Sequence, residues 1–147
     1  MIRQANIGDI SRISEILVFR KREFYRYIYH NDQYSFGELQ VLTVAREFQD
    51  HPEWLHEIWV YTDDFVKGII RVREREIVQL YVDSFFAGCG IGGELLDFAL
   101  EHFSAEYLWV LEKNPGAISF YERHGFRHRG VWKYEEGTTE CLQLMEQ

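Results

Sequence analysis

Four glycines occur within one short part of the segment QLYVDSFFAGCGIGGELL, which covers residues 79–96. The segment starts as an apolar strand, passes through the glycines and continues from Ile91 as an amphipathic helix. Such a turn leaves backbone N–H groups unpaired at the positive end of the helix, where they can bind a phosphate or pyrophosphate. Glycine suits the turn because a Cβ would block the anion and disfavour positive φ. The segment therefore predicts an anion-binding loop, with a glycine turn that binds nothing as the alternative.

The other reactive side chains give weaker signals. Cys89 lies inside the glycine loop, where a thiol could act as a nucleophile, but we expect it to point away while its backbone N–H binds. His124 and His128 are four residues apart, but Gly125 ends the helix between them, so they would not share a face. Because no histidines and carboxylates occur at metal-ligand spacing, we expect no metal site.

The composition is that of an acidic globular protein. The 147 residues suffice for one domain with a sizeable core, which we place over residues 1–147. The net charge of −8 disfavours a broad nucleic-acid-binding face and would suit a cationic substrate. Two cysteines without a CxxC spacing and no secretory leader predict a cytoplasmic protein. No apolar run approaches the ~20 residues of a membrane-spanning helix, so we expect no membrane association.

Residues 20–34 (RKREFYRYIYHNDQY) interleave basic and aromatic side chains. This pattern is typical of a single-stranded nucleic-acid platform, but it also fits an amphipathic helix and loop whose aromatic rings face the core or a substrate cleft. The negative charge of the whole chain favours the second interpretation.

The first half of the chain predicts a strand followed by two helices. Residues 1–4 form the strand, and Asn6 or Asp9 can cap a helix that carries isoleucines at helical spacing and extends through Ile28. The second helix is predicted over residues 36–48, and a His-Pro pair then ends it.

The second half of the chain predicts a sheet with two further helices. The expected elements are strands at residues 57–62, 65–72 and 76–82, a helix from Ile91 to Phe103, a strand at residues 107–111, a helix at residues 116–124 and strands at residues 128–134 and 138–145. Two short turns make the first three of these strands an antiparallel meander. The strand at residues 107–111 is fully apolar, so we expect it to be buried. The order β-α-α-β-β-β-α-β-α-β-β defines a mixed α/β domain.

Two segments of this chain resemble the motifs of the GCN5-related N-acetyltransferase (GNAT) family. LYVDSFFAGCGIGGELL is similar to its acyl-CoA pyrophosphate motif, and LWVLEKNPGAISFYERHGF at residues 108–126 looks like its next strand and helix. The resemblance implies a single domain with a twisted, mostly antiparallel sheet of about seven strands flanked by about four helices. It also implies that two strands splay apart at the acyl-CoA site. The sequence departs from the family pattern at Ala87, where the family has Gln or Arg, and at Ser84, where a proline is common.

The resemblance implies acetyl-CoA as the cosubstrate, with a place for each of its parts. The pyrophosphate would lie on the loop of Ala87, Gly88, Cys89, Gly90, Ile91, Gly92 and Gly93. The pantetheine arm would lie along the backbones of Leu80, Tyr81 and Val82 and reach Asn114, Ala117 and Tyr121 on the next helix. The N–H of Val82 would face the thioester oxygen and stabilise the charge that develops on it.

Two side chains are expected to move protons. Tyr121 is our candidate for the general acid, because a phenol with a pKa near ~10 suits protonation of a departing thiolate. A tyrosine that only packs under the helix is the alternative. Glu76 is our candidate for the base, although a glutamate beside a turn can be merely solvated. Strand alternation places Glu76 on one face of the strand, together with Val78, Leu80 and Val82. The secondary candidates for the base, Gln79 and Tyr81, lie on the other face.

The sequence therefore predicts an acetyl-CoA-dependent N-acetyltransferase that acts on a primary amine of a small molecule by direct attack in a ternary complex. Its substrate wall is expected to contain the aromatic residues Phe24, Tyr25, Tyr27, Tyr34, Trp132 and Tyr134. Two alternatives stay open: a protein N-terminal or lysine acetyltransferase, and a non-catalytic acyl-CoA-binding regulatory domain. A homodimer is possible because the family often dimerises.

Overall fold

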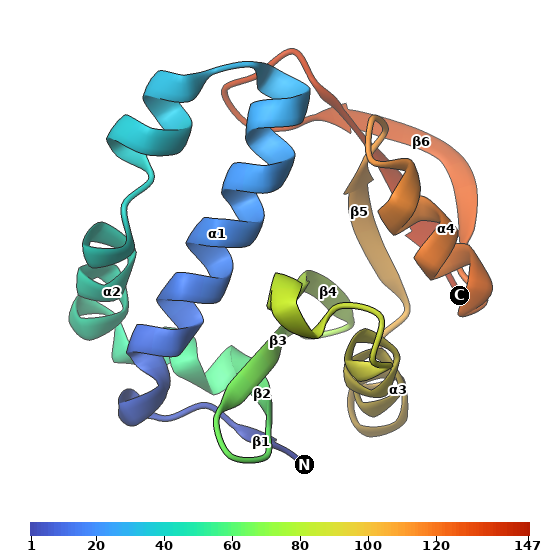
Figure 1. The fold of residues 1–147 in the computed structure, drawn as a ribbon. Coiled ribbons are helices and arrows are strands. Elements are labelled where there is room, and N and C mark those ends of the chain that lie inside the picture. Colours follow the sequence, from blue (N-terminus) through green and yellow to red (C-terminus); the bar gives the residue numbers. More distant parts are fainter.

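A seven-stranded sheet forms the centre of the protein, with helices on both of its faces (Figure 1). The computed structural model describes residues 1–147. The strands are β1 (Ile2–Gln4), β2 (Ile58–Thr62), β3 (Val66–Arg73), β4 (Glu76–Val82), β5 (Tyr107–Leu111), β6 (Arg127–Tyr134) and β7 (Cys141–Glu146), in the spatial order β1-β2-β3-β4-β5-β7-β6. The helices are α1 (Ile10–Tyr29), α2 (Val41–Asp50), α3 (Ile91–Phe103) and α4 (Pro115–Arg123). The predicted mixed α/β fold, with its mostly antiparallel sheet, is confirmed.

The first helix begins through two successive turns. Asn6 caps a short 3-10 turn (Ile7–Asp9), accepting a hydrogen bond from the N–H of Gly8 at 2.9 Å. The carboxylate of Asp9 accepts from the N–H of Asn6 at 2.9 Å and completes a capping box. It also forms two hydrogen bonds with Arg3, at 2.7 and 2.9 Å. Asn6 is therefore the capping residue, whereas Asp9 forms no side-chain cap hydrogen bond to α1 and instead joins the start of this helix to β1.

The second helix begins later than the sequence predicted. A π-helical turn occupies Gln33–Glu38, and Leu39 and Gln40 are extended, so that α2 starts at Val41 and not at residue 36. Phe36 lies in the separate turn, where its ring contacts the guanidinium groups of Arg22 and Arg26. These cation–π contacts connect the turn to α1 without continuing the helix.

Strands β4 and β5 separate almost as soon as they have paired. They are parallel neighbours only through Glu76 with Tyr107 and Ile77 with Leu108. Beyond these two pairs the sheet opens into a gap, so the predicted splaying of strands is confirmed. The expectation that β5 is fully buried is wrong: only Leu108 and Val110 are buried. Of the three partly exposed residues, Trp109 and Leu111 line this gap, whereas Tyr107 does not.

A β-bulge interrupts β4 inside the sheet. The register pairs Arg71 with Gln79 but Val72 with Ile77, so Val78 has no partner on β3. One extra residue in a strand reverses which face the following side chains occupy.

The bulge corrects the predicted alternation along β4. Ile77 and Leu80 both contact the core under α3, although they are three residues apart. Tyr81 packs against the opposite core, under α1, and Glu76 lies on that same face because it adjoins Ile77. Glu76 therefore shares a face with Tyr81 and Gln79, and not with Leu80 and Val82.

Two hydrophobic cores lie on the two faces of the sheet. One holds Leu95 and Leu96 of α3 together with Leu108, Phe126 and Met145, and the other holds Ile10, Ile13 and Ile16 of α1. Gly68 of β3 permits close packing under α3. A Cβ at this position would lie 3.0 Å from Ile91 and 3.1 Å from Leu95.

Candidate functional site

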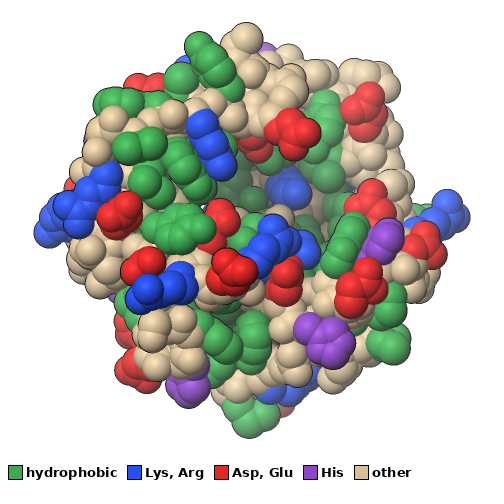
Figure 2. Space-filling view, turned by 180° about the vertical axis from the view of Figure 1, so that it is seen from behind, with side chains coloured by type: hydrophobic (Ala, Val, Ile, Leu, Met, Phe, Trp, Pro, Cys, Tyr) green, Lys and Arg blue, Asp and Glu red, His purple; other side chains and the backbone are tan.

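The gap between β4 and β5 is a cavity of about 400 Å³. Helices α1 and α4 and the connection between β6 and β7 complete its walls. The residues predicted from the sequence that line it are Glu76, Gln79, Leu80, Tyr81, Asn114, Ala117 and Tyr121, together with Phe24 and Tyr25 of the expected aromatic wall. Val82 and the glycine loop do not line the cavity, but β4 leads from it directly to the loop. In Figure 2, one face of the molecule is hollowed, with hydrophobic side chains around the hollow and charges of both signs at its rim.

The loop at residues 88–93 offers free backbone N–H groups at the start of α3. None of the six N–H groups donates a hydrogen bond within the chain, and the first amide of this helix to do so is that of Glu94, to Gly90. Gly88 and Gly90 have φ values of +78° and +84°, which a residue with a side chain adopts only with strain. The N–H of Ala87 differs because it donates to the carbonyl of Ser84 at 3.3 Å. The free donors therefore begin at Gly88, one residue later than predicted.

The thiol of Cys89 is exposed and lies 3.9 Å from the carbonyl oxygen of Ala87. It therefore points back along the loop, and its own N–H is among the free groups.

Helix α4 presents Tyr121 to the cavity. The carboxamide of Asn114 accepts a hydrogen bond from the N–H of Ala117 at 3.2 Å and fixes the start of the helix. Four residues after Ala117, the ring of Tyr121 packs edge-on against Phe126 with centroids 5.8 Å apart. Burial, together with the phenol of Tyr81, holds the pKa of Tyr121 well above its usual value. The phenol is therefore a protonated donor at neutral pH.

Strand β4 presents Glu76, Gln79 and Tyr81 to the same cavity. Burial is the main cause that raises the pKa of Tyr81 to about 12, and the carboxylate of Glu135 adds to it. The side-chain oxygen of Gln79 is buried and has no hydrogen-bond partner. An unpaired buried acceptor is costly, so a donor that reached this oxygen would form a favourable hydrogen bond.

Four polar or aromatic residues that line the cavity were not predicted as site residues: Lys21 on α1, Trp109 on β5, Lys133 on β6 and Glu135 after β6. Burial lowers the pKa of Lys21, and its ammonium forms no ion pair in the structure. The ammonium of Lys133 lies 4.2 Å from the centre of the Trp109 ring. Trp109 could have been found from strand alternation on β5, but no sequence signal brings Lys21 and Glu135 together across the fold.

The predicted aromatic wall is partly wrong. Phe24 and Tyr25 line the cavity, whereas Tyr27 is 78% exposed, because residues two apart on a helix face different ways. Trp132 and Tyr134 are 53% and 68% exposed. Their neighbours Lys133 and Glu135 face the cavity, and alternation along β6 turns Trp132 and Tyr134 away from it.

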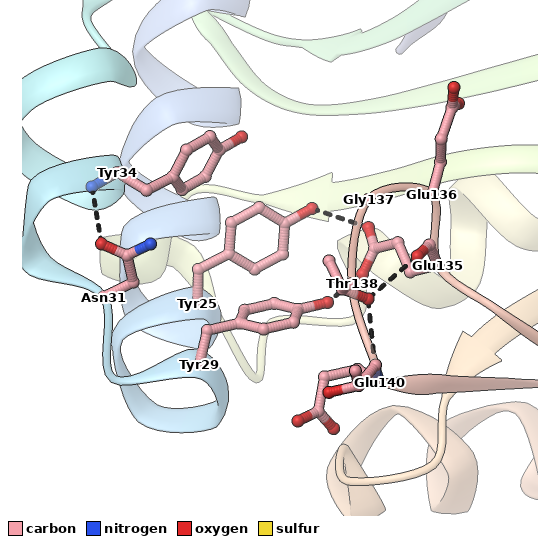
Figure 3. A pocket seen from close by; sticks show the side chains of 10 residues that line it. Tyr25, Tyr29, Asn31, Tyr34, Glu135, Glu136, Gly137, Thr138 and Glu140 are labelled. Carbon is pink, nitrogen blue, oxygen red and sulfur yellow. Dashed lines mark hydrogen bonds between the residues drawn. The ribbon is translucent and has the colours of Figure 1, made fainter.

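A second cavity of about 760 Å³ adjoins the first near the end of α1. Tyr25, Tyr29 and Tyr34 line one side of it, and the connection between β6 and β7, residues 135–140, lines the other (Figure 3). The carboxylate of Glu135 accepts hydrogen bonds from the hydroxyls of Tyr25, at 3.2 Å, and Tyr29. Tyr25 and Glu135 line both cavities, so the two spaces are neighbours with a shared wall.

No group of three or more histidine, cysteine or acidic side chains is arranged to hold a metal ion. None of the helices combines the length and the apolar character that crossing a membrane requires.

The chain belongs to the acetyltransferase (GNAT) family, whose family model matches residues 21–126. Over 75 residues it is 36% identical to an uncharacterized N-acetyltransferase from Methanocaldococcus jannaschii. That alignment covers 48% of this chain and 33% of the relative, so the match spans about a third of the length of this curated relative.

Solved structures share the fold over nearly the whole chain. An N-acetyltransferase from Staphylococcus aureus Mu50 has a TM-score of 0.77 and 16% identity, with 99% of each chain covered. The PaiA N-acetyltransferase from Thermoplasma acidophilum, solved in complex with coenzyme A, has a TM-score of 0.72 and 20% identity, covering 100% of this chain and 98% of its own. YncA, a putative acetyltransferase from Salmonella typhimurium solved with acetyl-CoA, has a TM-score of 0.68 and 16% identity, covering 100% of this chain and 92% of its own.

Proposed function

We propose that this protein is an acetyl-CoA-dependent N-acetyltransferase that acetylates a primary amine of a small molecule. The observation that carries the proposal is the opening between β4 and β5, which leads from six free backbone N–H groups to two protonated tyrosines. Membership of the acetyltransferase family supports it, as do the complexes of structural relatives with coenzyme A and acetyl-CoA.

The residues of the loop fit the pyrophosphate of acetyl-CoA. The free N–H groups of residues 88–93 surround the positive end of α3, and at Gly88 and Gly90 an added Cβ would project into open space, where the anion would lie. Ala87 contributes neither a polar side chain nor a free N–H, so the pyrophosphate-binding site consists of backbone donors alone.

The edge of β4 that faces the gap offers donors to the acetyl group. Asp83 donates its N–H to Lys67 on β3 at 2.9 Å. Because amide directions alternate along an antiparallel strand, the N–H groups of Val82 and Leu80 point away from β3 and toward β5. We assign the N–H of Val82 to the thioester oxygen, where it would stabilise negative charge in a site with little water.

The proton transfers follow from the two walls of the cavity. Acetyl-CoA supplies the activated acetyl group, and the net reaction converts R–NH₂ and acetyl-S-CoA to R–NH-acetyl and CoA-SH. Tyr121 would donate its proton to the sulfur as the C–S bond breaks. Glu76 would accept the proton that the amine loses, directly or through water, and its place on the face of Tyr81 supports this role. Transfer is direct from the thioester to the amine, with no acetylated enzyme.

The acceptor side of the cavity favours a small molecule over a protein. The hydroxyl of Tyr25 donates to Glu135, and this contact joins α1 to the connection between β6 and β7 in the wall of the cavity, which would restrict access for a peptide. A protein acceptor remains the second candidate. A cytoplasmic location and a homodimer also remain predictions; size-exclusion chromatography with light scattering tests the second.

Calorimetric titration with acetyl-CoA, with ATP as the control nucleotide, tests the proposal first. We expect a Kd in the micromolar range for acetyl-CoA and no heat with ATP. Release of free thiol in the presence of a panel of primary amines would then establish transfer. Absence of acetyl-CoA binding would overturn the proposal, and binding without thiol release from any amine would favour the non-catalytic alternative.

A further inference from the structure

The cavity beside the acetyl-transfer site has the properties of a cation-binding site. It lies between the last turn of α1 and the connection between β6 and β7, and no Lys, Arg or His side chain is among its lining residues (Figure 3). Through Tyr25 and Glu135 it shares a wall with the cavity between β4 and β5. A molecule whose amine reacts in one cavity could therefore place its other end in the second.

Three tyrosine rings form the aromatic side of this cavity. Tyr25 and Tyr29 are one helical turn apart on α1 and meet edge-to-face, with ring centroids 5.0 Å apart. Tyr34 approaches Tyr25 from the π-helical turn, at 5.6 Å between centroids. Burial raises the pKa of all three phenols, so the rings stay neutral. Neutral phenol rings attract a cation placed over their faces.

The opposite side of the cavity carries three carboxylates: Glu135, Glu136 and Glu140. The carboxylate of Glu140 pairs with Lys113 at 3.0 Å, whereas Glu135 forms no ion pair and accepts only neutral phenol donors. The ammonium of Lys21 faces the neighbouring cavity and forms no ion pair with Glu135, although burial lowers the pKa of Lys21 and the charge of Glu135 acts against this effect. Glu135 is therefore a partly buried negative charge at the junction of the two cavities.

The connection that carries Glu135 is held in place by its own hydrogen bonds. The hydroxyl of Thr138 donates to the carbonyl of Glu135 at 2.9 Å and accepts from the N–H of Glu140 at 3.1 Å. The carboxylate of Glu135 is thus positioned before any ligand arrives, which reduces the entropy that binding must offset.

We propose that Tyr25, Tyr29, Tyr34 and Glu135 bind a second, non-reacting ammonium group of the acceptor, and that the acceptor is a linear aliphatic diamine or polyamine. The proposal rests on the function proposed above, because it takes the cavity between β4 and β5 as the place of acetyl transfer. An amino acid fits less well, since its carboxylate would face Glu135 and Glu136. A simple alkylamine would leave the charge of Glu135 without a partner.

The bonds from the tyrosines to Glu135 could instead serve only to fasten the connection to α1. That role and the proposed one differ in what they predict for acceptors of equal size. A fastening role affects every acceptor alike, whereas a cation subsite affects only those with a second charge.

The kinetic test compares 1,6-diaminohexane with n-heptylamine, which have equal length and differ in one terminal ammonium group. We expect kcat/KM to be at least tenfold higher for the diamine in the wild-type enzyme. Glu135→Gln should remove most of this preference by lowering the value for the diamine much more than the value for n-heptylamine, because one charged contact of this kind changes affinity about tenfold. Glu101→Gln, which removes an exposed charge on α3, is the matched control and should preserve the preference. Equal values for the two amines, or an equal loss for both in Glu135→Gln, would overturn the proposal.

A binding test reports on the subsite without acetyl transfer. Hexamethonium, a linear dication with two quaternary ammonium groups, has no N–H to acetylate. We expect calorimetry to detect its binding to the wild-type protein and at least tenfold weaker binding to Glu135→Gln. The aromatic variant Tyr34→Leu, which leaves the hydrogen bonds to Glu135 in place, should also weaken it. If hexamethonium bound the wild-type protein and Glu135→Gln with equal affinity, the proposed cation subsite would be overturned, even if thiol release showed an active acetyltransferase. Loss of acetyl-CoA binding with retained, Glu135-dependent binding of hexamethonium would instead overturn the function and leave the cation site standing.

Discussion

The phenol of Tyr121 combines burial with access to the cavity between β4 and β5. Its pKa is raised because ionisation would place a negative charge in a poorly solvated wall that already holds Tyr81. A group with this property is a reliable proton donor at neutral pH and a poor nucleophile. The same burial explains why it can protonate a departing thiolate without losing its proton to solvent.

Replacement Tyr121→Phe should lower kcat by about 10²-fold or more, because general acid catalysis contributes roughly 10²–10⁴-fold. The Kd for acetyl-CoA should change less than threefold, since the ring and its packing against Phe126 remain. Steady-state thiol release and calorimetry measure the two quantities. Tyr134→Phe removes an exposed hydroxyl and serves as the control. An unchanged kcat in Tyr121→Phe would assign Tyr121 to packing alone.

Replacement Glu76→Gln tests the other proton transfer. We expect kcat to fall at least tenfold at neutral pH and to recover partly at high pH, where a larger fraction of the amine is already neutral. Glu74→Gln, at the adjacent turn, should leave kcat unchanged. A pH–rate profile identical to that of the wild type would exclude Glu76 as the base and direct attention to Gln79 and Tyr81.

At the scale of the elements, the site depends on how β4 is built. The bulge at Val78 transfers Glu76 to the face of Tyr81, and the early separation from β5 opens the gap. The order and type of the elements could be predicted because each has a local pattern: isoleucines at helical spacing, two tight turns, and the Asn-Pro start of α4. A bulge has no such pattern, since one unpaired residue changes neither composition nor periodicity.

The close approach of α3 to β3 at Gly68 also gives a prediction. Gly68→Ala would place a methyl group 3.0 Å from the side chain of Ile91 and 3.1 Å from that of Leu95, so these side chains, or α3 with them, must give way. We expect a loss of about 1–3 kcal/mol in the free energy of unfolding and weaker binding of acetyl-CoA, because the N–H groups of the loop move with the helix.

Chemical denaturation and calorimetry measure both effects of Gly68→Ala. Gly116→Ala is the matched control, since its Cβ would lie 3.9 Å from the nearest atom, an ordinary contact. Equal stability of the two variants would mean that α3 tolerates displacement at this contact.

At the scale of the whole molecule, the sequence predicted the framework of the site but not its acceptor side. The glycine loop, Asn114 and Tyr121 lie in contiguous motifs and could be located by number. Tyr29 and Glu135 meet only because α1 and the connection between β6 and β7 lie side by side, more than a hundred residues apart in the chain. Such a meeting depends on tertiary packing, which no local pattern encodes.

The buried tyrosines make the stability of the molecule sensitive to alkali. The pKa of Tyr81 is about 12 in the folded state and near ~10 when exposed, so the folded state retains this proton more strongly. The stabilisation is complete below about pH 10 and is lost as the pH rises toward 12. We expect the free energy of unfolding to fall over this range and to fall less steeply in Tyr81→Phe. Equal slopes in urea titrations of the two proteins would contradict this prediction.

The few backbone contacts between β4 and β5 also divide the molecule mechanically. Strands β1 to β4 and strands β5 to β7 are joined within the sheet by two residue pairs. Outside the sheet, the two parts are joined by side chains of the core under α3, by the contacts of Arg75 with Glu106 and Tyr107, and by the hydrogen bonds of two tyrosines of α1 to Glu135. Separating strands β5 to β7 from the rest therefore breaks few hydrogen bonds. The amide hydrogens of these strands should exchange through local unfolding, at a free energy well below that of global unfolding. A ligand that fills the gap contacts both groups and would bring their exchange rates together. The two parts of the molecule should therefore unfold separately while the gap is empty and together once a ligand fills it.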